Sequence, residues 1–353
     1  MDPLTHGFLG ATIGQAAFGR RLGWRGVVAA ATAAMLPDLD IVMNATGPMG
    51  EWLYHRSITH ALWFAPVLAA LLGHAAARGR AEPAGGGTPM ERLLGDGRRR
   101  TWTLLFLLTL LSHPLLDWCT SYGTQLLAPF SNRRFALDAV AIIDPAYSLA
   151  LVAALVVGAW RGVGSAGARS AAAAVLVLTT AYLLYGLGLN GAAEAQARAE
   201  LASEGVHAAE VRAYPTLLQL YLRRIVVREG DDVRVGWLSL WSPRTIEWQR
   251  FTAARDPLVT AARETDEGRL LEWFAMGQTA AALHGSTTGT VVEIDDLRYG
   301  FPSRPQEGLW GIRARFDAAG RLEGRPERID RPLPAPARAL VGQIFRETFR
   351  PRP

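Results

Sequence analysis

Eight imidazole and carboxylate side chains stand at the ends of apolar segments within the first 145 residues of the sequence. They are His6, Asp38, Asp40, His55, His60, His113, Asp117 and Asp144. Ionisable groups at membrane depth are costly and usually functional. Histidine together with aspartate makes the ligand set of zinc and of related hydrolytic metals. The set therefore predicts a metal centre with hydrolytic chemistry.

Two pairs of these residues have a spacing that favours metal ligation. His113 and Asp117 are four residues apart, which places both side chains on one face of a helix. Asp38 and Asp40 follow Pro37 at a spacing of two residues. A turn there can direct both carboxylates at one ion, and one of them could bridge two metals.

The motif HRSITHALWF contributes His55 and His60 to the set. Their five-residue spacing fits poorly on one helical face, so we expect His55 in the loop before the helix. Arg56, in the same motif, and Arg133 and Arg134 further along would grip a phosphate beside the metal, because guanidinium groups bind phosphate well.

Each of these residues also has an ordinary structural interpretation. Asp144 is as well suited to capping a helix as to binding metal or acting as a base. Asp38 or Asp40 alone would be a turn residue after Pro37, and His6 alone would be an interfacial polar residue. Such interpretations suffice for single residues but do not explain the whole set.

Six apolar segments carry these residues and approach the length of about 20 residues that a spanning helix needs. They cover residues 4–18, 26–43, 58–77, 102–118, 146–160 and 171–190. Arginine in alternate connectors, including the Gly- and Pro-rich loop 78–100, assigns those connectors to the cytoplasmic side. The candidate ligands then all lie at the extracytoplasmic side. We expect residues 1–192 to form a transmembrane bundle of about six helices with a metal site at that face.

The sequence changes character after residue 192. LQLYLRRIVVREGDDVRVGWLSLW predicts two strands around a polar turn, and GTVVEIDDLRYGFP and LWGIRARFDAAGRL predict two more. TIEWQRFTAAR and GRLLEWFAMGQTAAAL have helical spacing, and ARALVGQIFRETFR predicts a short helix. We expect residues 193–353 to form a soluble, extracytoplasmic α+β domain.

Composition and motifs exclude several other classes of protein. The single cysteine, Cys119, excludes an intramolecular disulfide and a cysteine-rich metal cage. The net charge is +5, but the arginines form no dense basic stripe, so no nucleic-acid partner is expected. The sequence contains no Walker, GxSxG or HExxH motif.

The motifs DPLTHGFLG, LPDLD, HRSITHALW and HPLLDWCTSYGTQLLAPFSNRRFALD resemble those of the YdjM-type inner-membrane metal-dependent hydrolases. The resemblance covers roughly residues 1–190. It implies a helical hydrolase of the bacterial inner membrane, distantly similar to zinc-dependent phospholipase C and the single-strand nucleases. In that wider group an HxxxD pair holds metal, and His113 and Asp117 correspond to it. The further downstream HxxxE pair is missing, because no histidine lies between residues 113 and 207. One or two metals therefore fit better than three.

The leading hypothesis is a multi-pass membrane hydrolase that cleaves a phosphoester of a lipid or lipid-linked substrate. One or two zinc ions, or manganese, are expected on His6, Asp38, Asp40, His55, His60, His113 and Asp117. Asp40 or Asp144 would act as base or orient a ligand imidazole. The alternative is a structural metal site in a membrane anchor whose outer domain is a binding module. An ion transporter is less favoured, because the charged residues gather at one end of the segments.

Overall fold

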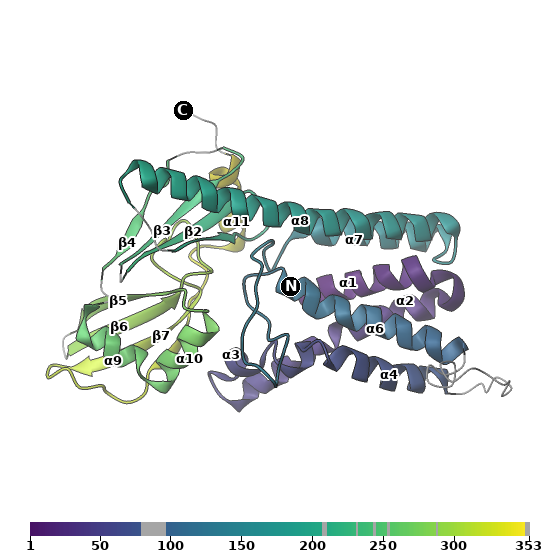
Figure 1. Ribbon diagram of the computed structural model, residues 1–353, viewed down its shortest axis with the longest axis horizontal. Helices are drawn as coiled ribbons and strands as arrows, with labels where there is room; N and C mark the ends of the chain where they lie inside the picture. Colours follow the sequence, from purple (N-terminus) through teal and green to yellow (C-terminus); the bar gives the residue numbers. More distant parts are fainter. Residues whose placement is uncertain are drawn as a thin grey trace. The chain divides into compact units, whose positions relative to one another are not determined.

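The computed structural model describes residues 1–78, 97–206, 210–230, 232–242, 245–252, 255–286 and 289–349. Most of the predicted loop 78–100 lies outside these residues. The chain forms two compact units (Figure 1). The first unit consists of Met1–Val42, Tyr54–Ala136 and Ile143–Leu183, and the second of Met43–Leu53, Leu137–Ile142 and Leu184–Pro353. Parts of two connectors between the predicted membrane segments thus belong to the second unit.

Residues 1–203 are mainly helical. The helices are α1 (Pro3–Ile13), the π-helix η1 (Gly14–Phe18), α2 (Gly19–Met35), the 3-10 helix η2 (Pro37–Thr46), α3 (Gly50–Tyr54), the 3-10 helix η3 (Ile58–His60), α4 (Phe64–Ala77), α6 (Gly97–Trp118), α7 (Pro145–Arg161) and α8 (Ala166–Ser203). Two of these helices start with the same device, an aspartate cap followed by proline. Asp2 accepts the Thr5 N–H before α1, and Asp144 accepts the Tyr147 N–H before α7.

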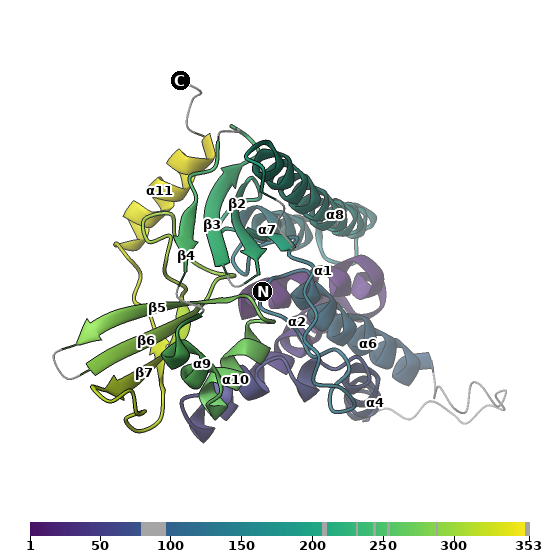
Figure 2. The same cartoon turned by 60° about the vertical axis from the view of Figure 1, so that its left-hand side comes forward.

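Helices α1 and α2 lie side by side (Figures 1 and 2). Helix α2 has a kink at Gly23, whose φ of 55° is accessible to glycine at little cost. A Cβ at Gly10 would lie 2.5 Å from the Ala30 carbonyl oxygen. The close approach of these two helices therefore depends on small residues at their interface.

The number of candidate spans differs from the six that the sequence predicts. Among the described residues, two helical runs are long and apolar enough to cross a membrane, Pro3–Thr46 and Ala166–Ser203. A third is possible if Gly50–His60 and Phe64–Ala77, which are bent by 63° at a break, form one span. Segments 4–18 and 26–43 belong to one helical run, and α7 has only 17 residues. The described helices therefore support two or three spans rather than six.

The second unit contains two antiparallel four-stranded sheets, parts of which are labelled in Figure 2. Their strands are β1 (Glu210–Pro215), β2 (Leu222–Glu229), β3 (Asp232–Ser239) and β4 (Gln249–Phe251), and β5 (Thr279–Ser286), β6 (Gly289–Asp296), β7 (Trp310–Asp317) and β8 (Glu327–Asp330). Helices α9 (Pro257–Arg263), α10 (Asp266–Phe274) and α11 (Ala337–Phe349) complete the unit. The four predicted strands are confirmed as β2, β3, β6 and β7.

Two helical predictions in this unit are partly wrong. TIEWQRFTAAR contains β4, and GRLLEWFAMGQTAAAL is helical only up to Phe274 before β5 begins at Thr279. The turn after α10 carries Met276 and Gly277, both with positive φ. This left-handed pair ends the helix, although the alanines that follow have high helix propensity.

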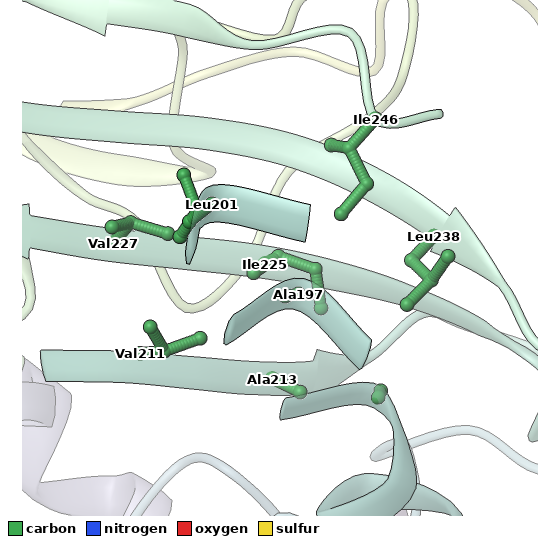
Figure 3. Close-up of a cluster of buried hydrophobic side chains, with 9 residues drawn as sticks. Ala197, Leu201, Val211, Ala213, Ile225, Val227, Leu238 and Ile246 are labelled. Atoms are coloured by element: carbon green, nitrogen blue, oxygen red, sulfur yellow. The ribbon is translucent and has the colours of Figure 1, made fainter. Parts of the chain in front are cut away.

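The end of α8 forms a core with the first sheet (Figure 3). Its buried residues are Ala193, Ala197 and Leu201 from the helix, Val211, Ala213, Ile225, Val227 and Leu238 from the sheet, and Ile246. Each fully buried Leu, Ile or Val contributes about 1.5–3 kcal/mol by removal of apolar surface from water. Apolar burial therefore ties the last turns of α8 into the second unit.

Candidate metal centre

Four side chains from three elements of the first unit converge on one point. Asp38 lies at the start of η2, His60 ends η3, and His113 and Asp117 lie one turn apart on α6. One ligand atom from each residue lies within 4.8 Å of all the others. The side chains of His60, His113 and Asp117 are fully buried, and that of Asp38 is 10% exposed.

The distances between these ligand atoms match a tetrahedral coordination shell. The Nε2 atoms of His60 and His113 are 3.0 Å apart. They lie 3.3 Å and 3.4 Å from Asp117 Oδ2, and 3.6 Å and 3.4 Å from Asp38 Oδ1. Two donors that are each 2.0–2.1 Å from a tetrahedral zinc ion are about 3.3 Å apart.

Unsatisfied carboxylate oxygens also favour a cation. Asp38 Oδ2 and Asp117 Oδ2 are buried and accept no hydrogen bond from the described residues. A buried charged oxygen without a partner is costly, and a metal bound at Asp117 Oδ2, which also lies 3.3 Å from His60 Nε2 and 3.4 Å from His113 Nε2, would remove that cost. The two imidazoles and two carboxylates therefore fit a divalent metal ion, without specifying which one.

Hydrogen bonds at Nδ1 orient both candidate imidazole ligands. His113 Nδ1 donates to the Ala34 carbonyl oxygen at 2.6 Å. His60 Nδ1 lies 3.0 Å from Thr59 Oγ1 and 3.3 Å from Asp40 Oδ2. A proton held on Nδ1 leaves the lone pair on Nε2 for a metal.

Asp40 and His55, both predicted as ligands, lie outside the group of four. Asp40 Oδ1 bonds to His55 Nδ1 at 2.7 Å. Asp40 Oδ2 accepts the Arg56 backbone N–H at 3.1 Å and the Thr59 hydroxyl at 2.9 Å. These bonds tie Asp40 to the HRSITH segment and place it beside His60, a geometry consistent with its predicted role of orienting a ligand imidazole.

His6 packs against the group of four and is not one of its members. Its ring stacks on His113 with centroids 3.6 Å apart, and its Nε2 lies 3.1 Å from Asp117 Oδ1. The α-amino group of Met1 also contacts Asp117 Oδ1. His6 therefore helps to hold a candidate ligand in place.

Arg56 is buried beside the group of four. Its Nη2 lies 3.0 Å from Asp117 Oδ1, and its Nη1 donates to Thr120 Oγ1 at 2.8 Å. Its guanidinium carbon lies 4.8 Å from the centre of the Tyr122 ring. Tyr122 and Thr120 were not predicted as site residues. Tyrosine and threonine are common in connectors that have no function, so their presence in the sequence was no reason to select them.

The two other predicted arginines differ from each other in exposure. Arg134 is buried, donates to the Gly123 carbonyl oxygen at 2.9 Å and lies 5.4 Å from the centre of the Tyr122 ring. Arg133 is exposed and lies 5.2 Å from the centre of the Phe135 ring. Arg134 and Arg56 thus share one aromatic ring, and Arg133 does not take part.

Asp144 is a helix cap and lies outside the group of four. Its Oδ1 accepts the Tyr147 N–H at 3.0 Å and its Oδ2 accepts the Tyr182 hydroxyl at 2.8 Å. One carboxylate oxygen therefore caps α7 and the other joins its start to α8, which agrees with the helix-cap interpretation.

Comparison with known proteins identifies the family. A family model described as "YdjM inner membrane protein" matches residues 1–193, which include all four candidate ligands. No curated protein and no solved structure matches the chain. Because the match spans more than half of the sequence, the chain belongs to the YdjM inner membrane protein family.

Proposed function

We propose that this protein is a metal-dependent hydrolase that cleaves a phosphoester of a membrane lipid or lipid-linked substrate. The observation that carries the proposal is the group of Asp38, His60, His113 and Asp117, whose ligand atoms have the spacing of a tetrahedral shell. The proposed cofactor is one zinc ion, with manganese as the other candidate. A bound ion of this kind acidifies a coordinated water and polarises a phosphoryl oxygen.

His55 is suited to the proton transfers of such a reaction. Its side chain is 18% exposed, whereas those of His60 and His113 are fully buried. The bond from His55 Nδ1 to Asp40 fixes the ring and leaves Nε2 to accept or donate a proton. In this proposal Asp40 is a positioning residue for both His55 and His60.

Arg56 and Arg134 are suited to holding the phosphate. Two guanidinium groups lie within 4.8 Å and 5.4 Å of the centre of the same Tyr122 ring. Two positive charges at one ring would attract an anionic ligand, and phosphate matches the donor geometry of arginine.

A lipid substrate is supported by the residues that flank the carboxylates. Three exposed apolar side chains lie next to the two aspartates in η2. They are Leu39, between Asp38 and Asp40, and Ile41 and Val42, directly after Asp40. An acyl chain can contact these side chains while its headgroup reaches the carboxylates. We further propose an inner-membrane location with residues 193–353 on the extracytoplasmic side. The HxxxD pair supports a distant similarity to zinc-dependent phospholipase C.

A structural metal site in a membrane anchor, with the outer domain as a binding module, is the second candidate function. The near-complete burial of four protein ligands favours it. Structural zinc sites have four protein ligands, whereas catalytic sites keep one position for water. The two functions therefore differ in whether the bound metal has an exchangeable position.

The deciding experiment measures metal content and activity on detergent-solubilised protein. Elemental mass spectrometry should find about one metal ion per chain in the wild type and in His74→Ala, an exposed histidine at the end of α4. His113→Ala and Asp117→Ala should lose the metal. Lipid phosphoesters in micelles should be cleaved faster than soluble phosphodiesters. Absence of metal after reloading would refute the hydrolase.

Cobalt substitution separates the two candidate functions. In a hydrolase, added phosphate should change the visible spectrum of the cobalt protein, because an anion can enter the open position. An unchanged spectrum, together with inactivity towards every phosphoester tested, would establish the structural site instead.

A further inference from the structure

The segment between Asp40 and His55, called the loop below although it includes most of η2 and α3, is closed at its two ends by a hydrogen bond beside the group of four. The hydrogen bond from His55 Nδ1 to Asp40 Oδ1 joins residues 15 positions apart. The Arg56 N–H reinforces this closure by donating to Asp40 Oδ2. Asp40, at one end of the loop, is therefore bound to His55 at the other end and also lies beside His60 Nδ1.

The rest of this loop, Met43–Leu53, belongs to the second unit. Trp52 is fully buried there, and its ring stacks on Phe274 of α10 with centroids 5.2 Å apart and an angle of 13° between the planes. Phe274 in turn makes an edge contact with Trp310 of β7 at 6.2 Å. An apolar core thus fixes the loop two residues before Tyr54 and three before His55.

Arg328 of β8 binds the same segment by three kinds of contact. Its Nη1 donates to the Pro48 carbonyl oxygen at 3.0 Å, and its Nη2 donates to Glu51 Oε2 at 2.8 Å. Its guanidinium carbon lies 4.9 Å from the centre of the Trp52 ring. One largely buried arginine therefore restrains backbone, carboxylate and indole together.

We propose that Trp52 and Arg328 are positioning residues for the metal centre, acting through the loop that ends at Asp40 and His55. Restraint of residues 43–53 limits the positions that Asp40 and His55 can take, and Asp40 holds the proton of His60 on Nδ1. Release of the loop would let the Asp40 carboxylate rotate away from His60 Nδ1. The His60 ring would then no longer be held with Nε2 directed at the metal site. The inference rests on the metal-binding part of the proposed function. It assigns to Arg328, in the C-terminal part of the chain, a role in positioning the residues around the metal site.

The test compares Arg328→Ala with Arg315→Ala in the full-length protein. Arg315 is the matched control, because it forms an exposed ion pair with Glu327, the residue next to Arg328. Zinc affinity is measured by competition with a chelator. Hydrogen exchange of the peptide around Arg56 is measured on metal-free protein. Arg328→Ala should bind zinc about tenfold more weakly, at the low end of losses caused by residues that support ligands. Its Arg56 amide should also exchange about tenfold faster, and Arg315→Ala should match the wild type in both measurements.

Trp52→Ala and Trp52→Phe provide a second arm of the test. Trp52→Phe keeps an aromatic ring against Phe274 and should restore most of the affinity that Trp52→Ala loses. If Trp52→Ala does not fold, Arg328→Ala decides the question. Wild-type zinc affinity and Arg56 exchange in Arg328→Ala would overturn the inference while leaving the proposed function intact. A wild type that binds no metal would refute the proposed function, and Arg56 exchange would still decide whether the loop is positioned by Arg328.

Discussion

The Nε2 atoms of His60 and His113 face each other at 3.0 Å, and the Nδ1 atom of each ring lies beside an acceptor oxygen on its far side. The Ala34 carbonyl oxygen can only accept, so His113 Nδ1 must donate to it. Asp40 Oδ2 holds the His60 proton on Nδ1 in the same way. With a proton on Nδ1 and none on Nε2, the two rings would direct two lone pairs at one another. Such an arrangement is unfavourable alone and becomes favourable when a cation lies between the nitrogens.

Metal should therefore stabilise the folded protein. A ligand that binds only the native state at 100 times its Kd adds about 2.7 kcal/mol to the free energy of unfolding. Thermal unfolding of chelator-treated protein should show a Tm that rises with free zinc. His113→Ala should show no rise, while His74→Ala should respond like the wild type. A wild-type Tm that is independent of zinc and manganese would contradict the site.

Asp38 and Asp40 should differ in their effect on metal affinity, although they are two residues apart. Asp38→Asn removes a charged candidate ligand, and its loss of affinity should exceed about 100-fold. Asp40→Asn weakens only the orientation of His60 and His55, which corresponds to about 10- to 100-fold. Chelator competition on both variants measures the difference. A larger loss in Asp40→Asn would reverse the two assignments.

The sequence identified the residues around the candidate centre but did not show which of them are candidate ligands and which orient those ligands. The four-residue spacing of His113 and Asp117 on a helix determines their common face, and the structure brings both into the group of four. Asp38 and Asp40 lie in a 3-10 helix, where the spacing of two does not tell which carboxylate turns towards His113. That choice depends on His55 and Thr59, which bind Asp40 across a loop.

The fold shows the same limit. Strands β2 and β3 were predicted because their apolar residues and polar turn are adjacent in the sequence. The kink at Gly23 and the end of α10 at Met276–Gly277 depend on backbone conformations with positive φ, which apolar periodicity does not encode. The hydropathy pattern similarly predicted six spans from six apolar segments. Only two or three of the described helical runs have the length and composition of a span.

Asp144→Ala should reduce stability without affecting metal binding. Loss of an aspartate cap costs about 0.5–2 kcal/mol, and the hydrogen bond from Tyr182 is lost as well. Asp256→Ala is the matched control, because Asp256 caps α9 by accepting the Leu258 N–H. Denaturant unfolding should show a similar loss in both variants, and elemental analysis should find the wild-type metal content. Metal loss specific to Asp144→Ala would restore Asp144 as a candidate ligand.

Arg56→Lys should separate phosphate recognition from metal binding. Lysine keeps the positive charge near Asp117 but cannot donate to Asp117 and Thr120 with the planar fork that arginine uses. Metal content should stay at the wild-type level, while phosphoester turnover should fall on the order of 100-fold, as for the loss of a preorganised donor to a developing negative charge.

Arg133→Lys is the matched control for Arg56→Lys, because Arg133 is exposed and its guanidinium group lies over the Phe135 ring. It should keep both metal and turnover. Inhibition by inorganic phosphate should weaken in Arg56→Lys and remain unchanged in Arg133→Lys, because only Arg56 shares the Tyr122 ring with Arg134 beside the candidate ligands. Equal inhibition in the two variants would assign the phosphate to other residues and leave Arg56 as a structural partner of Asp117.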